Sequence, residues 1–223
     1  MRKLIFCFVL LFVGSLQAQT IKFTVEGLVQ KPKNAKFVYL VSETLVVGKP
    51  DLFLVMPMEG NQFKIPATCN LEGGLLRKGF IFLDERGDIT LNDVKSKIKQ
   101  KVWFVGASAN LKSIYLEDVK LDIENPYNLQ SAKIIGGGIY LQQSKDATQA
   151  LRDKKFLSFI KKNADSPVAL SELDNFILFA NIPGFIKDFD FSSPMQLYGA
   201  LSSRLKNSKE GKAVKKKIDE GKK

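Results

Sequence analysis

The chain from residue 19 to residue 138 carries its hydrophobic residues in short runs separated by turn residues. Residues 21–25 alternate apolar and polar side chains, which is the period of a half-buried strand. Further short apolar runs, many of them β-branched or aromatic, occupy residues 37–41, 52–56, 63–65, 80–83, 89–91, 102–105, 114–116, 119–123 and 133–135. Many short strands with turns between them predict an antiparallel β-sandwich or a barrel-like sheet.

An acidic turn separates two of these runs. Residues 80–83 and 89–91 flank it, and together they predict a hairpin. Asp84, Glu85 and Asp88 lie in the turn, but they lack the alternating ligand spacing of a calcium loop. We interpret them as turn and surface charges.

The hydrophobic period changes after the three glycines at 136–138. Apolar residues at helical spacing follow, and they predict a helical region over residues 139–207. One such stripe consists of Leu173, Phe176, Ile177 and Ala180. The glycines are not followed by the Lys-Ser/Thr of a phosphate-binding loop, so we expect them to form a flexible joint between the two parts. The pattern as a whole predicts an α+β fold.

Two serines mark the expected starts of helices. Ser166 precedes Pro167, a preferred first helical residue, and Ser193 lies three residues before Gln196 in a capping box. Residues 182–191 are apolar enough to pack against these helices. Helical stripes of this kind need a partner surface, so we expect the helices to pack on each other and on the sheet.

The last segment, residues 208–223, is basic. The chain has a net charge of +11, and residues 204–223 contain nine basic residues against three acidic ones. The remaining body is nearly balanced, which argues against nucleic acid as a partner. We expect a helix that frays, with only Val214 and Ile218 as an apolar stripe. The candidate contacts for a protein or an anionic envelope surface are Lys209, Lys212, Lys215, Lys216 and Lys217.

The N-terminus has the three zones of a secretory signal peptide. Arg2 and Lys3 precede an apolar run over residues 4–13, and small and polar residues then lead to Ala18. The run is shorter than the roughly 20 residues that a membrane-spanning helix needs. We therefore expect residues 1–18 to be removed near Ala18, and the mature chain to be periplasmic and without a transmembrane segment.

The candidate chemistry is sparse. The sequence contains no histidine, the commonest general base and transition-metal ligand, and only two cysteines, Cys7 and Cys69. Cys69 would be the one thiol left after signal removal, and we interpret it as a small buried side chain. Serine nucleophiles have no histidine to activate them. The sequence predicts neither catalysis by the isolated chain nor a cofactor or metal.

Two C-terminal segments resemble a known family. Residues 159–173 are similar to an FI-x-x-N-P-x-S-x-x-S/A-L-x-x-L segment, and residues 201–212 to an L-x-x-x-L-K-x-S-x-x-G-K segment. Both segments occur in bacterial extracytoplasmic thioredoxin-like proteins of the TlpA/ResA and AhpC/TSA type, in their N-terminal domain of unknown function. Residues 23–27, 38–40 and 60–63 fit that domain more loosely. The resemblance implies a β-rich domain followed by helices, located outside the cytoplasm.

The resemblance does not bring the family's redox chemistry with it. No residue of this chain matches the C-x-x-C pair of the thioredoxin domain. Two hypotheses stay open. The first is a non-catalytic extracytoplasmic binding or scaffold module, with the exposed face of the sheet or the lysine-rich tail as its candidate contact surface. The alternative is a truncated or partner-completed component of a thiol–disulfide oxidoreductase.

Overall fold

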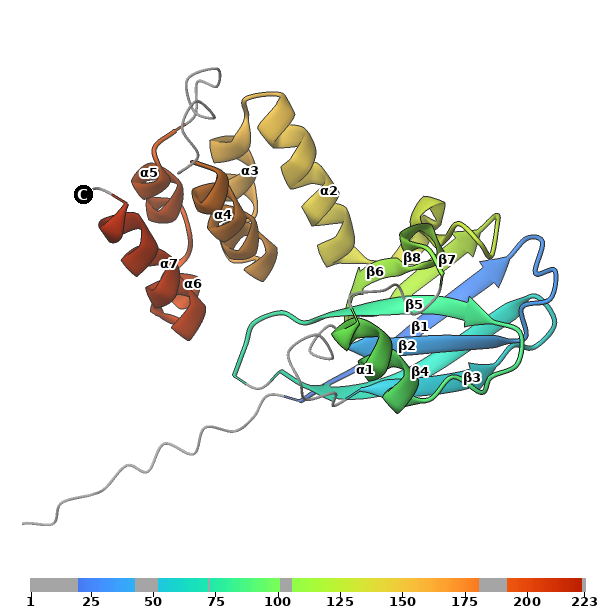
Figure 1. The fold of residues 1–223 in the computed structure, drawn as a ribbon. Coiled ribbons are helices and arrows are strands. Elements are labelled where there is room, and N and C mark those ends of the chain that lie inside the picture. Colours follow the sequence, from blue (N-terminus) through green and yellow to red (C-terminus); the bar gives the residue numbers. More distant parts are fainter. Residues whose placement is uncertain (1–19, 43–51, 72, 101–105, 181–191, 222–223) are drawn as a thin grey trace, which may run out of the picture.

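Two four-stranded sheets followed by a group of helices make up the fold (Figure 1). A computed structural model describes residues 20–42, 52–71, 73–100, 106–180 and 192–221. The first sheet has the order β4 (Gln62–Asn70), β1 (Thr20–Val29), β7 (Val119–Ile123), β8 (Lys133–Gly137). The second has the order β3 (Phe53–Pro57), β2 (Phe37–Ser42), β5 (Lys78–Asp84), β6 (Lys112–Tyr115). The predicted α+β fold is confirmed, as a two-sheet arrangement rather than a closed barrel.

The main core lies between the two sheets. In β1 the side chains of Phe23, Val25 and Val29 point inward, as the alternation predicts. Neighbouring strands pair antiparallel, except that β1 and β7 run parallel within the described sheets. Other buried members of this core include Val38, Leu40, Phe63, Ile65, Cys69, Ile81, Ile114, Leu121, Ile123 and Leu129.

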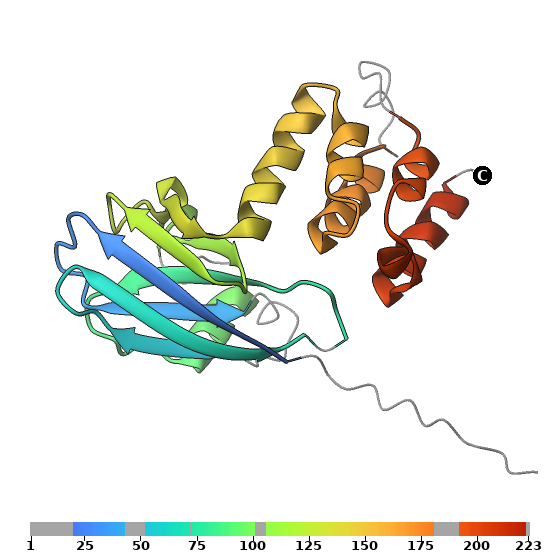
Figure 2. The same ribbon diagram turned by 180° about the vertical axis from the view of Figure 1, so that it is seen from behind.

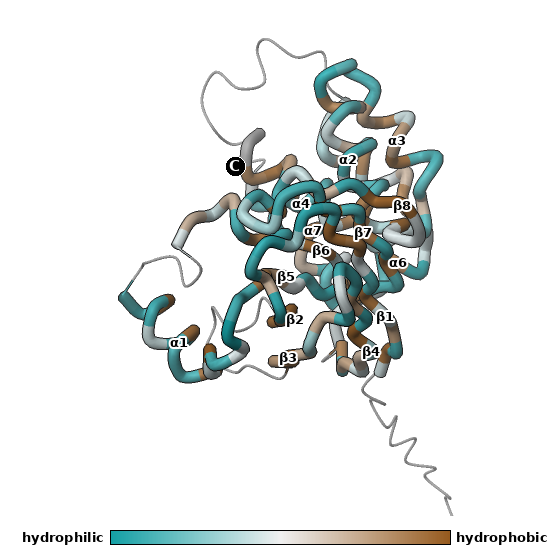
Figure 3. Tube along the Cα trace, turned by 90° about the vertical axis from the view of Figure 1, so that its right-hand side faces the viewer, coloured by the Kyte–Doolittle hydropathy of each residue, from teal (hydrophilic) through white to brown (hydrophobic). Residues whose placement is uncertain are grey.

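Residues 89–91, where we predicted a strand, instead lead into a helix, α1 (Leu91–Lys99). The hairpin prediction is wrong because Thr90 caps this helix: its Oγ accepts the backbone N–H of Asp93, and the Asp93 carboxylate accepts the N–H of Thr90. Figure 3 shows α1 as mostly hydrophilic with a few hydrophobic positions. Its buried residue Val94 packs on Tyr39 and Phe82, so α1 covers the outer face of the second sheet.

The three glycines form a closely packed corner between strand and helix. Gly137 ends β8, and Gly138, with φ +65°, is the N-cap of α2 (Ile139–Arg152). The Gly138 N–H donates to the Asp118 carbonyl at 2.8 Å, and a Cβ at Gly137 would collide with the same carbonyl. Where we expected a flexible joint, the structure shows a closely packed corner. The glycines supply left-handed backbone conformation and close packing instead.

The helices pack around a second core. After α2 come α3 (Phe156–Lys162), α4 (Pro167–Ala180), α5 (Pro194–Gly199), α6 (Ser203–Asn207) and α7 (Lys209–Glu220), while the β-part holds the short 3₁₀ turns η2 (Ser108–Asn110) and η3 (Leu129–Ser131). This core contains Phe156, Phe159, Ile160, Leu170, Leu173, Phe176, Ile177, Leu197, Tyr198, Leu201, Leu205, Val214 and Ile218.

The capping predictions are confirmed. Ser193 Oγ accepts the Gln196 N–H and the Gln196 side chain accepts the Ser193 N–H, so α5 starts with a complete capping box. α4 starts at Pro167, and Ser166 Oγ accepts the N–H of Val168 at 3.2 Å. Such bonds satisfy backbone donors that have no partner within the helix.

The basic C-terminal segment is a packed helix as far as Glu220. Val214 and Ile218 are buried, as their spacing predicts, and Gly211 is buried with them. Ser208 caps the helix by accepting the Gly211 N–H at 2.9 Å. This apolar face attaches α7 to the other helices, so the segment is no free tail over residues 209–220.

The helices also meet the β-part at the loop between β4 and β5. Leu75 from this loop packs against the helical core, and its N–H donates to Glu210 Oε1 at 2.9 Å. Figures 1 and 2 show the loop reaching toward α6 and α7. A cavity of about 240 Å³ lies at this junction, between the loop, α4 and α7.

Three predictions concern residues that the structure does not describe. The signal peptide over residues 1–18, the strand at 102–105 and the packed segment at 182–191 lie outside the described residues. The side chain of Ala180, predicted on the apolar stripe of α4, also lies outside them.

Candidate functional site

The outer face of the β4-β1-β7-β8 sheet is open. Along β4, every second residue from Gln62 to Asn70 is exposed while the residues between them are buried. Seen from behind, this sheet lies in front of the second sheet, and none of the described helices covers it (Figure 2). The second sheet differs, because α1 packs on its outer face.

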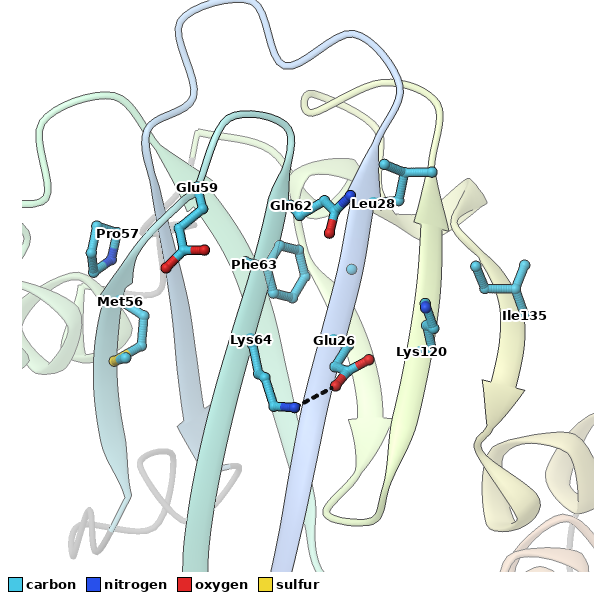
Figure 4. Close-up of a pocket in the computed structure, with 11 residues that line it drawn as sticks. Glu26, Leu28, Met56, Pro57, Glu59, Gln62, Phe63, Lys64, Lys120 and Ile135 are labelled. Carbon is cyan, nitrogen blue, oxygen red and sulfur yellow. Dashed lines mark ion pairs between the residues drawn. The ribbon is translucent and has the colours of Figure 1, made fainter.

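A hollow of about 470 Å³ opens on this side of the molecule (Figure 4). Eleven residues line it, from β1, β3, β4, β7, β8 and the turn between β3 and β4, and we call it the sheet hollow. Its polar residues are Glu26, Glu59, Gln62, Lys64 and Lys120. The hollow therefore combines both signs of charge on one surface.

One ion pair crosses the sheet hollow. Lys64 Nζ lies 3.0 Å from Glu26 Oε1, across the β4–β1 pairing (Figure 4). The hydrogen bond from Lys64, its charge and the charge of Lys120 hold the pKa of Glu26 below its ordinary value. Glu26 therefore stays ionised at neutral pH and serves as an acceptor rather than a proton donor.

The floor of the sheet hollow is aromatic and closely packed. Phe63 is only 4% exposed, and it lies opposite Gly27 in the register of β4 and β1. A Cβ at residue 27 would collide with the Phe63 ring, so the glycine makes room for the ring. This contact fixes the shape of the floor.

The wall of the sheet hollow also carries apolar side chains. Ile135 on β8 is 52% exposed, although it is a large hydrophobic residue. Leu28 on β1, separated from Ile135 by β7, is half-buried in the same lining. The exposed face of the sheet was one of the two candidate contact surfaces, but the sequence named none of these residues, because they come from five strands that only the fold brings together. The alternation along residues 62–70 was the available signal.

Two of the lysines proposed as partner contacts are held by carboxylates. Lys217 Nζ lies 2.6 and 2.8 Å from the two carboxylate oxygens of Asp174 on α4. Lys215 Nζ contacts both oxygens of Asp219, one helical turn away, at 2.7 and 2.6 Å. Lys217 therefore joins α7 to α4, whereas the pair of Lys215 and Asp219 lies within α7.

The other three proposed lysines are more exposed. Lys216 lies 3.7 Å from Glu220, a spacing that gives little stability at a surface. Lys209 and Lys212 are exposed and form no ion pair with another described residue. None of the five lines the sheet hollow.

Cys69 is a buried core residue, as predicted. It is 4% exposed and points from β4 into the core between the sheets. The Arg77 guanidinium donates a hydrogen bond to its Sγ at 3.0 Å. Burial keeps this thiol away from reagents and partners in the folded chain.

The acidic turn is held by local hydrogen bonds. Asp84 Oδ2 accepts the backbone N–H groups of Arg86 and Gly87 at 2.8 and 2.7 Å, and Arg86 pairs with Asp88 at 3.4 Å. These contacts fit the predicted role in a turn. Across the described residues, no three metal-ligating side chains come together.

The strongly buried titratable groups make structural contacts. Lys112 Nζ donates to the carbonyls of Gln130 and Ala132 at 3.0 and 2.8 Å, and burial lowers its pKa, with a smaller contribution from the charge of Lys145. The ammonium holds the η3 turn to β6. A lysine with two carbonyl partners is occupied as a structural donor.

Glu117 has the opposite shift. Its carboxylate accepts the N–H groups of Tyr140 and Leu141, each at 3.0 Å, and so caps α2. Burial nevertheless raises the pKa of Glu117, more than these hydrogen bonds lower it. Glu117 is thus a helix cap at the corner between the β-part and α2.

Among the helices described, none combines the length and hydrophobicity needed to cross a bilayer. Comparison with family models, with curated proteins and with solved structures finds no match to this chain.

Proposed function

We propose that this chain is a non-catalytic binding module that works outside the cytoplasm and contacts a partner protein through the sheet hollow. The observation that carries the proposal is the difference between the two outer sheet faces. α1 covers one of these faces, whereas no element of the described part of the chain covers the other, which carries the hollow. A concave surface with convergent polar groups is the usual form of a binding site.

The lining favours a protein as the partner. Lys64 and Lys120 stand beside Glu26 and Glu59, so a polymer of one charge sign would meet repulsion as well as attraction. Exposed Ile135 adds an apolar contact near these charges. Protein interfaces combine an apolar centre with polar groups around it.

The chemistry of the described residues supports binding over catalysis. Glu26 is held ionised by Lys64, Glu117 caps a helix, and Cys69 is buried. The N-terminal signal pattern supports a location outside the cytoplasm. The thiol–disulfide alternative has no described residue that favours it.

Site-specific cross-linking tests the surface. We would place a photo-crosslinking residue at position 135 in the sheet hollow and, as a control, at position 178 on α4, whose leucine is 57% exposed. We expect position 135 alone to cross-link one periplasmic protein, saturably and in competition with unmodified chain. Equal cross-linking from both positions would contradict the proposal.

A charge reversal makes the test sharper. Lys120→Glu removes a positive charge from the sheet hollow, whereas Lys99→Glu makes the same change on the exposed side of α1. We expect the first to weaken capture by the identified partner at least roughly ten-fold and the second to leave it unchanged. Insulin reduction by the isolated chain would refute the non-catalytic assignment.

A further inference from the structure

The outer edge of β3 is the least protected strand edge in the described sheets. β3 pairs with β2 on one side, and no described strand pairs with it on the other. Its sequence from Phe53 to Met56 is wholly apolar, and these residues are only half-buried. An exposed apolar edge of this kind is a template for another strand.

The other three sheet edges carry features that discourage pairing. β4 has Pro66 in its centre, β6 has four residues and the inward-pointing Lys112, and the β7–β8 pairing is interrupted by a bulge. Proline, short length, inward charge and bulges are the usual protections of an edge strand. On β3 the corresponding feature is Pro57, at the very end.

Phe53 and Val55 direct their backbone groups outward. Ser42 N–H donates to the Leu52 carbonyl at 3.0 Å, and Met58 N–H donates to the Lys36 carbonyl at 2.8 Å. Alternate residues of an antiparallel strand bond to the same neighbour, so positions 52, 54, 56 and 58 face β2. The N–H and C=O groups of Phe53 and Val55 therefore point to the open side.

Both faces of β3 are apolar. The side chains of Phe53 and Val55 pack with the cluster under α1, and those of Leu54 and Met56 pack against the core between the sheets. A strand added beside β3 would extend both clusters. The strand that fits best is itself apolar on both faces, and β3 has this character.

We propose that two copies of the chain pair through β3, antiparallel and with Val55 opposite Val55 of the second copy. The β3-β2-β5-β6 sheet of one copy then continues into the same sheet of the second copy. The result is one eight-stranded sheet about a two-fold axis. Val55 exchanges two hydrogen bonds with its equivalent. Phe53 donates to Pro57 of the second copy and receives none, because proline has no N–H.

The dimer goes beyond the proposed function and does not depend on it. The two surfaces share Met56 and Pro57 of β3, so each is tested at residues that the other does not use. Lys120→Glu and cross-linking at position 135 test the sheet hollow, and substitutions at Val55 test the β3 edge. A chain that dimerises but captures no partner refutes the first proposal alone. A monomer that captures its partner refutes the second alone.

Sedimentation of the chain over a range of concentrations tests the dimer. The full chain and a chain starting at Thr20 are compared, so that association through the apolar N-terminal run is recognised. We expect both to dimerise. Val55→Pro removes an outward N–H without breaking the β2 ladder, so dimer affinity falls at least about ten-fold. Val55→Thr keeps the N–H and serves as the control that still dimerises.

Hydrogen exchange on the unmodified chain keeps the proposal testable if Val55→Pro fails to fold. The Val55 amide is expected to exchange slowly at high protein concentration and quickly on dilution. A monomer at every concentration, with fast exchange of the Val55 amide, overturns the proposal. The β3 edge would then be available to a strand of another protein. A dimer in which this amide exchanges quickly overturns it as well.

Discussion

Phe63 and Gly27 lie opposite each other in the β4–β1 pairing, and the phenyl ring occupies the space where a side chain at residue 27 would start. The ring is almost fully buried and belongs to the core between the sheets. The same contact forms the floor of the sheet hollow. Stability and the shape of the candidate site therefore depend on one glycine–aromatic contact.

Gly27→Ala is expected to lower the free energy of unfolding by about 1–3 kcal/mol, because the new Cβ must displace the Phe63 ring within a packed core. Urea unfolding measures the change. The matched double variant Gly27→Ala with Phe63→Leu should lose less than the sum of the two single variants, since the smaller side chain makes room. Additive losses would show that the ring and the glycine are not coupled.

Glu117→Gln is expected to change how stability depends on pH. Burial raises the pKa of the folded Glu117 carboxyl above its ordinary value of 4.5, so the folded chain holds a proton that the unfolded chain has released. The free energy of unfolding therefore falls as pH rises from about 4.5 through the raised pKa. Glutamine does not titrate, so this part of the fall should be absent from the variant.

Asp165 supplies the comparison of opposite sign. Hydrogen bonds from Arg204 and Ser202 lower the pKa of this exposed carboxyl below its ordinary value of 3.8. Its contribution to the free energy of unfolding is therefore present above about pH 3.8 and is lost as the pH falls through the lowered pKa. In a plot of the free energy of unfolding against pH, Asp165→Asn should thus remove only the fall on the acid side. Urea unfolding at several values between about pH 3 and pH 7 separates the two variants. Identical profiles for both variants would contradict the assignments.

Cys69 is expected to react with thiol reagents only when the chain unfolds. A full chain carrying Cys7→Ser has one thiol, and in the fold that thiol is 4% exposed. Labelling in buffer should be at least roughly 100-fold slower than in denaturant, because it waits for an opening of the core. Fast labelling of the folded chain would reopen the thiol–disulfide alternative.

The parts of the fold that the sequence predicts are those set by local patterns. Alternation along residues 62–70 predicts which side chains face the core, and Ser193 with Gln196 predicts the start of α5. The prediction of a strand over residues 89–91 is wrong because a run of three residues is too short to distinguish a strand from a helix. The capping pair of Thr90 and Asp93 was the signal that would have decided it.

Other features depend on contacts between distant segments. Three consecutive glycines suggest a flexible backbone. In the structure, Gly137 and Gly138 instead adopt positive φ and pack closely against Asp118, which forms a corner. The lysines of α7 look like a free basic run, yet Asp174 of α4 holds Lys217. The sheet hollow likewise draws residues from five strands, which no local pattern joins.

Gly211→Ala is expected to destabilise the helical part by about 1–3 kcal/mol. A Cβ at this position would collide with the backbone carbonyl of Leu205, and a backbone atom cannot move aside as a side chain can. α6 and α7 would have to separate, which would also disturb Val214 and Ile218 on the buried face of α7.

Gly199→Ala is the matched control, because the added Cβ at the end of α5 meets no atom within 4 Å. Its free energy of unfolding should stay unchanged or rise by up to about 1 kcal/mol, as expected for a glycine replaced in a helix without strain. Thermal and urea unfolding followed by circular dichroism at helical wavelengths measure both variants. If Gly211→Ala behaves like Gly199→Ala, the close approach of α7 to Leu205 does not hold the two helices together, and attachment of the basic helix must be ascribed to Val214, Ile218 and the Lys217–Asp174 pair instead.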